Sequence, residues 1–172
     1  GGVLWGHKRG AAWLAKTGLL KATLWQPEEM SSLISADNLR YADKELLAGK
    51  QRIAGAIYQA ELDLSHPLTF GITNAKLPVF KNSTSLLQPS HKPFVNVALY
   101  SAAPQLAGYT AAEYIPRISQ SAVLLAHNVG KGRVIAMTDN PVFRGYFKGS
   151  SRLLINAMYL SHGFSASSQT EE

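Results

Sequence analysis

The sequence predicts a single α/β domain with a largely parallel sheet, helices on both faces and one antiparallel hairpin near a sheet edge. Short apolar strands alternate with helical segments along most of the chain, and the apolar runs at 122–126 and 134–137 contain no alternating polar residues. Strands of that kind are covered on both faces, and the glycines between the two runs favour a tight turn. The 172 residues are enough for one domain with a substantial core.

The first part of the chain predicts two strand–helix units followed by an insertion. Residues 2–6 form a short apolar strand, and residues 11–15 form a helix that stops at Thr17-Gly18. Residues 22–25 form a second strand, and Pro27 with two acidic residues behind it marks the next helix start. Residues 36–50 break the hydrophobic periodicity with charged and amide side chains, which predicts an exposed insertion.

The second part predicts further strands and a final helix. We expect strands at 53–63, 77–80 and 95–100, a turn at 66–71, a short helix at 111–118 and the hairpin at 122–137. The last helix begins near Ser150 or Ser151 and presents one broad apolar stripe, formed by Leu153, Leu154, Ala157, Met158 and Tyr159. Residues 1–164 are assigned to the domain, and the small polar residues 165–172 to a disordered tail.

Composition excludes several functional classes. The net charge is +6, but Lys and Arg are dispersed and no basic run reaches five residues, so we expect a solvated basic surface and no nucleic-acid binding. The sequence lacks an apolar run long enough to span a membrane. The chain has no cysteine, which excludes disulfides, thiolate metal sites and a cysteine nucleophile.

The segment Gly6-His7-Lys8-Arg9-Gly10 lies between a predicted strand and a predicted helix. That arrangement is typical of a nucleophile elbow, in which glycines permit a sharp turn that exposes the central side chain. Lys8 is the central residue, so a first interpretation is an unconventional lysine nucleophile. A second is a turn with solvated basic residues. A third is that Lys8 and Arg9, with the free amides of the first helical turn, hold a carboxylate or a phosphate.

The segment 139–148 follows a strongly apolar strand and contains Asp139, Asn140, Pro141 and an Arg144 flanked by aromatic residues. Proline after asparagine favours a turn, and the carboxyl end of a strand is where α/β proteins often place function. Arg144 is therefore a candidate clamp for an acidic group. The structural alternative is that Asp139 caps the turn, pairs with Arg144 and locks the last helix with it.

The sequence predicts no metal site. Its five histidines lie far apart, at positions 7, 66, 91, 127 and 162, and none has the spacing of a zinc motif on one element. His66 precedes Pro67 in a predicted turn, where we expect it to bond the loop backbone.

No serine lies in a G-x-S-x-G motif, so the sequence does not predict a serine nucleophile elbow. The glycines at 130 and 132 lie inside a hairpin instead of preceding a helix, which excludes a phosphate loop.

Five segments resemble one family of domains. The segments 2–14, 63–71, 130–136, 139–147 and 153–157 are similar to the class I glutamine amidotransferase-like domain found at the C-terminus of bacterial zinc carboxypeptidases of the carboxypeptidase A type. The similarity covers roughly residues 2–164. It implies a three-layer, flavodoxin-like fold that lacks its first βα units, and it implies a periplasmic or secreted location.

The resemblance implies an accessory role, because this family's nucleophile is a cysteine and Lys8 occupies that position here. The zinc ligands of such proteins belong to an upstream peptidase domain of the same polypeptide, so no cofactor is expected in this chain. The candidate ligand-binding residues are His7, Lys8, Arg9, Asp139, Asn140 and Arg144. We expect a noncatalytic binding domain that can dimerise through an open sheet edge at residues 2–6. The alternative is a small hydrolase or transferase that uses Lys8.

Overall fold

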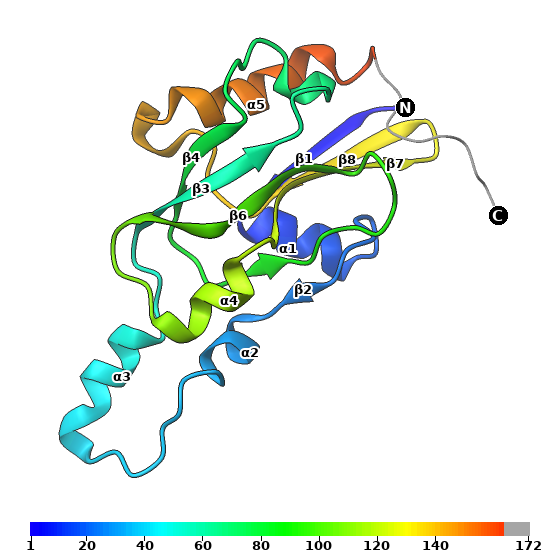
Figure 1. Ribbon diagram of the computed structural model, residues 1–172. Coiled ribbons are helices and arrows are strands. Elements are labelled where there is room, and N and C mark those ends of the chain that lie inside the picture. The colour runs from blue at the N-terminus through cyan, green and yellow to red at the C-terminus, as the bar shows by residue number, and fades with distance from the viewer. Residues whose placement is uncertain (164–172) are drawn as a thin grey trace.

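A computed structural model describes residues 1–163, so the tail predicted at 165–172 lies outside the described residues. The strands form one eight-stranded sheet (Figure 1). They are β1 Val3–His7, β2 Leu24–Trp25, β3 Ala56–Leu62, β4 Lys76–Lys81, β5 Leu86–Leu87, β6 Asn96–Ala107, β7 Ala122–Val129 and β8 Gly132–Met137. The helices are α1 Arg9–Lys16, α2 Pro27–Ser31, α3 Lys44–Lys50, α4 Ile115–Ile118 and α5 Lys148–Leu160, with 3₁₀ turns at Tyr41–Asp43, Pro67–Thr69, Ala112–Tyr114 and Phe143–Gly145.

The sheet is mixed, and the prediction of a largely parallel sheet is wrong. Its main path is β1-β8-β7-β6-β3-β4, and β5 pairs with both β7 and β2. β1 and β8 run parallel, whereas every other pairing of the described strands is antiparallel. The prediction failed because continuous apolar runs show that both faces of a strand are covered, but they do not set the direction of its neighbours.

Both faces of β8 are buried, as predicted for the apolar run. Val134 and Ala136 belong to a buried cluster that includes Leu14 of α1, whereas Ile135 and Met137 belong to a second cluster that includes Leu153 of α5. Figure 1 shows α1 and α5 on opposite sides of the sheet. Alternate side chains of β8 therefore pack into two buried clusters on opposite faces of the sheet, one beside α1 and one beside α5.

The predicted hairpin is confirmed and its first strand is longer than expected. β7 and β8 pair in register from Leu124 opposite Met137 to Val129 opposite Gly132. Gly130 in the turn has φ of 53°, a conformation that glycine adopts without a steric penalty. On the other side of β8, β1 ends the sheet, because among the described strands it pairs with β8 alone.

The stripe predicted for the last helix is partly wrong. Leu153 and Ala157 are buried, but Met158 and Tyr159 are 66% and 77% exposed. The buried side of α5 turns instead toward Asn156, whose Nδ2 donates to the carbonyl oxygens of Leu68 at 2.8 Å and of Phe70 at 2.9 Å. A buried amide with two backbone partners thus fixes the helix to the turn near His66, and the apolar pattern did not reveal it.

The insertion predicted at 36–50 is exposed, as expected, and contains α3. None of the α3 residues is buried, and Figure 1 shows α3 at the tip of an arm that extends from the sheet.

The strand predicted at 95–100 is longer, since β6 continues to Ala107, and β5 was not predicted. None of the helices in residues 1–163 combines the length and the hydrophobicity that a membrane crossing requires.

Candidate functional site

The candidate site begins at the turn from β1 to α1. Lys8 separates the two elements with φ of 51° and ψ of −116°, a combination that is unfavourable for a residue with a side chain. Its N–H donates to the Met137 carbonyl at 3.0 Å, and its own carbonyl accepts from the Ala12 N–H at 3.1 Å. These two bonds hold the strained residue between the sheet and the first turn of the helix. The backbone thus has the strand–turn–helix path of a nucleophile elbow.

The elbow depends on Gly6. A Cβ on Gly6 would lie 2.5 Å from Cδ1 of Leu14 and 2.8 Å from the carbonyl carbon of Gly10, so the β1 backbone lies directly against the helix. A Cβ on Gly10 would meet no atom within 4 Å. The first glycine of the motif is therefore required by close packing, whereas the second is not.

The three basic residues of the elbow are accessible to different degrees. His7 and Arg9 are exposed, and Lys8 is half-buried. In residues 1–163, no hydrogen bond or ion pair joins the Lys8 ammonium to a carboxylate or a histidine. A lysine nucleophile requires a neighbouring group that takes up its proton or lowers its pKa, so the arrangement does not favour that chemistry.

Asp139 lies in a buried network and does not have the predicted partner. Its carboxylate forms an ion pair with the Lys81 ammonium at 3.2 Å and accepts from the Tyr100 hydroxyl at 2.5 Å. The Lys81 ammonium also donates to the Ser85 carbonyl at 3.0 Å. Both charged side chains are fully buried. The interpretation in which Asp139 pairs with Arg144 is therefore wrong, because the charge of Asp139 is neutralised inside the core.

The electrostatics of this network keep Tyr100 protonated. Burial raises the pKa of Tyr100 well above its usual value of 10.0, and the adjacent Asp139 carboxylate raises it further. Tyr58, whose ring meets that of Tyr100 edge-on at 5.7 Å, has its pKa raised to about 12, chiefly by burial. A protonated Tyr100 can donate to Asp139 throughout the physiological pH range.

Arg144 is exposed and lies beside an aromatic stack. Its φ of 49° and ψ of 20° are left-handed, and its guanidinium lies 5.4 Å from the centre of the Phe143 ring. Phe143 in turn stacks on Phe80 of β4, with 3.8 Å between ring centres. Asn140 accepts from the Val142 N–H at 3.0 Å and so closes the turn after Asp139. Arg144 thus remains available to an anionic ligand.

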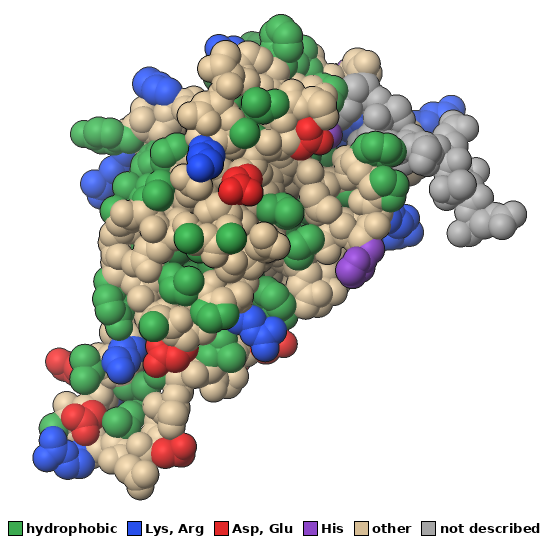
Figure 2. Space-filling model, viewed as in Figure 1, with side chains coloured by type: hydrophobic (Ala, Val, Ile, Leu, Met, Phe, Trp, Pro, Cys, Tyr) green, Lys and Arg blue, Asp and Glu red, His purple; other side chains and the backbone are tan. Residues whose placement is uncertain are grey.

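The two predicted loops begin at the same edge of the sheet. β1 and β8 are parallel, and His7 lies opposite Met137, so the elbow and the segment from Asp139 to Arg144 both leave from strand carboxyl ends. Of the six candidate residues, His7, Lys8, Arg9 and Arg144 can reach solvent, whereas Asp139 is buried and Asn140 is engaged in its turn. Figure 2 shows the Lys and Arg side chains scattered over the visible face.

No group of three or more histidine, aspartate or glutamate side chains in residues 1–163 is arranged to hold a metal ion. His66 accepts the Leu68 N–H at Nδ1 over 3.1 Å, as expected for a histidine that bonds its own turn. Burial lowers the pKa of His66.

Sequence reasoning missed Lys81 and Tyr100. A signal for Lys81 was present, because Leu77, Val79 and Lys81 share one face of β4 and all three are buried. A lysine in phase with two buried aliphatic residues indicates a buried cation, which requires a counter-charge.

No protein-family model matches this chain, and no curated protein sequence matches it. Its function is therefore inferred from the geometry of the site together with the resemblance of its motifs.

Proposed function

We propose that this chain is a noncatalytic accessory and binding domain of a secreted or periplasmic zinc metallocarboxypeptidase, with a class I glutamine amidotransferase-like, three-layer fold. One observation carries most of the proposal. The elbow keeps its strained backbone and its close packing at Gly6, but its central position holds Lys8 without an acid–base partner among the described residues. A scaffold of this kind retains the shape of a catalytic turn and lacks the group that forms bonds in it.

The domain's proposed ligand is anionic, such as an acidic peptide end or a negatively charged glycan. The exposed side chains of His7, Arg9 and Arg144 leave from the same edge of the sheet, and Asp139 adds no negative charge to that edge because Lys81 neutralises it. Arginine favours carboxylate groups because its planar guanidinium can donate two parallel hydrogen bonds.

The purified chain is expected to hydrolyse neither glutamine nor p-nitrophenyl esters, because Lys8 has no acid–base partner among the described residues to activate it as a nucleophile. The measurement is release of ammonia or nitrophenolate at neutral pH by the chain and by its Lys8→Met variant, with Lys16→Met as the matched control on α1. Turnover that disappears in Lys8→Met and persists in Lys16→Met would replace this proposal with its alternative. That alternative is a small hydrolase or transferase, and the strained φ and ψ of Lys8 are the observation that favours it.

The proposed partners are an upstream peptidase domain of the same polypeptide and a second copy of this chain. If the first is correct, the upstream reading frame encodes an H-x-x-E motif followed by a ligand histidine roughly a hundred residues later, the pattern of a two-His, one-Glu zinc site. Its absence from the complete frame would refute the parentage.

Pairing through β1 predicts a sedimentation mass that increases with protein concentration, since an edge strand exposes unpaired backbone groups.

A further inference from the structure

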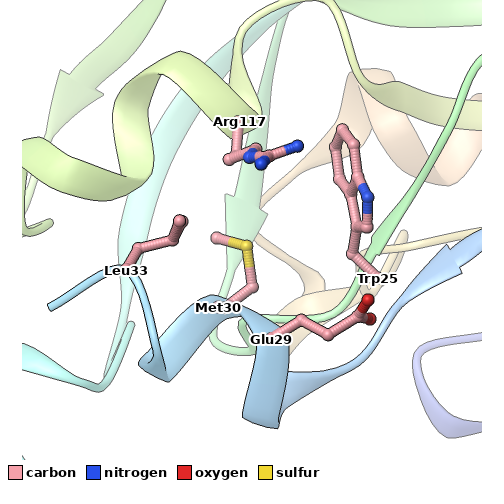
Figure 3. Close-up of a pocket in the computed structure, with 5 residues that line it drawn as sticks. All are labelled: Trp25, Glu29, Met30, Leu33 and Arg117. Carbon is pink, nitrogen blue, oxygen red and sulfur yellow. The ribbon is translucent and has the colours of Figure 1, made fainter.

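A small pocket between α2, α4 and β2 has no role in the proposed function. It has a volume of about 70 Å³ and is lined by Trp25, Glu29, Met30, Leu33 and Arg117 (Figure 3). Met30 is almost fully buried and forms part of the apolar lining together with Leu33. The charged residues Glu29 and Arg117 are exposed at the rim. A lining that combines apolar side chains with two opposite charges at the rim can orient a small polar ligand.

The Arg117 guanidinium is held by an aromatic ring and not by a carboxylate. It lies 5.1 Å from the centre of the Trp25 ring. A cation–π contact with an indole attracts a guanidinium without using its N–H groups, which stay available to other partners. Within residues 1–163 no ion pair engages Arg117, although Glu29 lines the same pocket. Arg117 is therefore preorganised to receive a carboxylate from outside the chain.

Glu29 is fixed on the same pocket as a separate anion. Its Oε2 accepts from the Gln26 N–H at 2.6 Å, a bond that closes the N-terminal turn of α2 and sets the direction of the side chain. Figure 3 shows Arg117 and Glu29 on opposite sides of the Met30 side chain. A simple carboxylate ligand would be repelled by Glu29, and a simple amine would be repelled by Arg117. A ligand that carries both charges satisfies both residues.

We infer that this pocket binds a small free α-amino acid. The carboxylate of the ligand pairs with Arg117, its ammonium group pairs with Glu29, and its side chain lies on Met30 and Leu33. The volume of about 70 Å³ limits that side chain, since it is about half that of a cavity of about 150 Å³ known to hold benzene. Glycine and alanine therefore fit better than an aromatic amino acid. Free amino acids are also the products of a carboxypeptidase, but the inference does not depend on that activity.

The test is methyl NMR of the whole chain labelled with [methyl-¹³C]methionine, titrated with L-alanine. The chain has three methionines, so the spectrum has three methyl signals. L-Alanine is expected to shift the Met30 signal and to leave those of Met137 and Met158 in place. N-acetyl-L-alanine lacks the ammonium group and L-alaninamide lacks the carboxylate, so each is expected to bind about tenfold or more weakly. L-Phenylalanine is expected to bind more weakly than L-alanine because of its size.

Variants test the two charges separately. Arg117→Gln and Glu29→Gln are each expected to weaken alanine binding about tenfold or more, and glutamine at position 29 retains an acceptor for the Gln26 N–H. The matched controls, Arg52→Gln and Glu28→Gln, change exposed residues outside the pocket lining and are expected to bind as the unmodified chain does. An unmoved Met30 signal, equal binding of N-acetyl-L-alanine, or unchanged affinity in either pocket variant would overturn the inference. These outcomes do not bear on the elbow, so they are independent of the proposed function.

Discussion

Replacing Asp139 with asparagine is expected to lower the free energy of unfolding by about 3–5 kcal/mol, because the fully buried Lys81 ammonium then has no counter-charge. Lys81→Met is expected to have a cost of the same order, since it leaves the Asp139 carboxylate buried with the Tyr100 hydroxyl as a neutral partner. The measurement is urea denaturation at neutral pH, followed by circular dichroism. Both variants should unfold at a lower urea concentration with little change in the slope.

The control for this prediction is an ion pair at the surface. Arg40 and Asp43 lie 3.7 Å apart, and Arg40 is highly exposed, so Arg40→Gln is expected to change the unfolding free energy by less than about 1 kcal/mol. Combining Lys81→Met with Asp139→Leu removes both buried charges and is expected to recover much of the stability lost in either single variant. Equal effects of Asp139→Asn and Arg40→Gln would show that the buried pair does not have the predicted importance.

The buried pair also shows which part of the site a single sequence can predict. Asp139 is a candidate ligand-binding residue or turn cap in the sequence because it follows a strongly apolar strand, whereas in the structure its carboxylate is buried. Its partner was assigned wrongly to Arg144, five positions away, whereas Lys81 lies 58 positions away on another strand. Hydrogen-bond partners at such separation depend on strand order, and one sequence contains no direct signal for that order.

The same distinction applies to the fold. The elbow, the β7–β8 hairpin and the exposed insertion at 36–50 were predicted because their determinants are local, namely glycine positions, continuous apolar runs and loss of periodicity. The direction of the sheet depends on pairings such as β3 with β6 and β5 with β7, which connect distant segments. The two-residue strands β2 and β5 are too short for any hydrophobic period to be detected.

Gly6→Ala is expected to destabilise the chain by about 1–3 kcal/mol, because the added methyl group enters a space already filled by Leu14 and by the backbone of Gly10. A Leu14 side chain can rotate away, but backbone atoms at 2.8 Å can be relieved only if β1 and α1 separate. For a domain of this size, about 2–4 °C of melting temperature corresponds to each kcal/mol, so the loss is measurable by thermal unfolding.

Gly10→Ala provides the matched comparison, because it adds the same methyl group to the other glycine of the elbow. Gly10 is the second residue of α1, its φ is not positive, and its Cβ would meet no atom within 4 Å. Alanine is therefore expected to stabilise the helix by up to about 1 kcal/mol. Opposite signs for the two variants would establish that the elbow is held by contact between β1 and α1. Destabilisation by both would instead indicate that the turn needs the backbone freedom of glycine at each end, and the close-packing explanation would then fail.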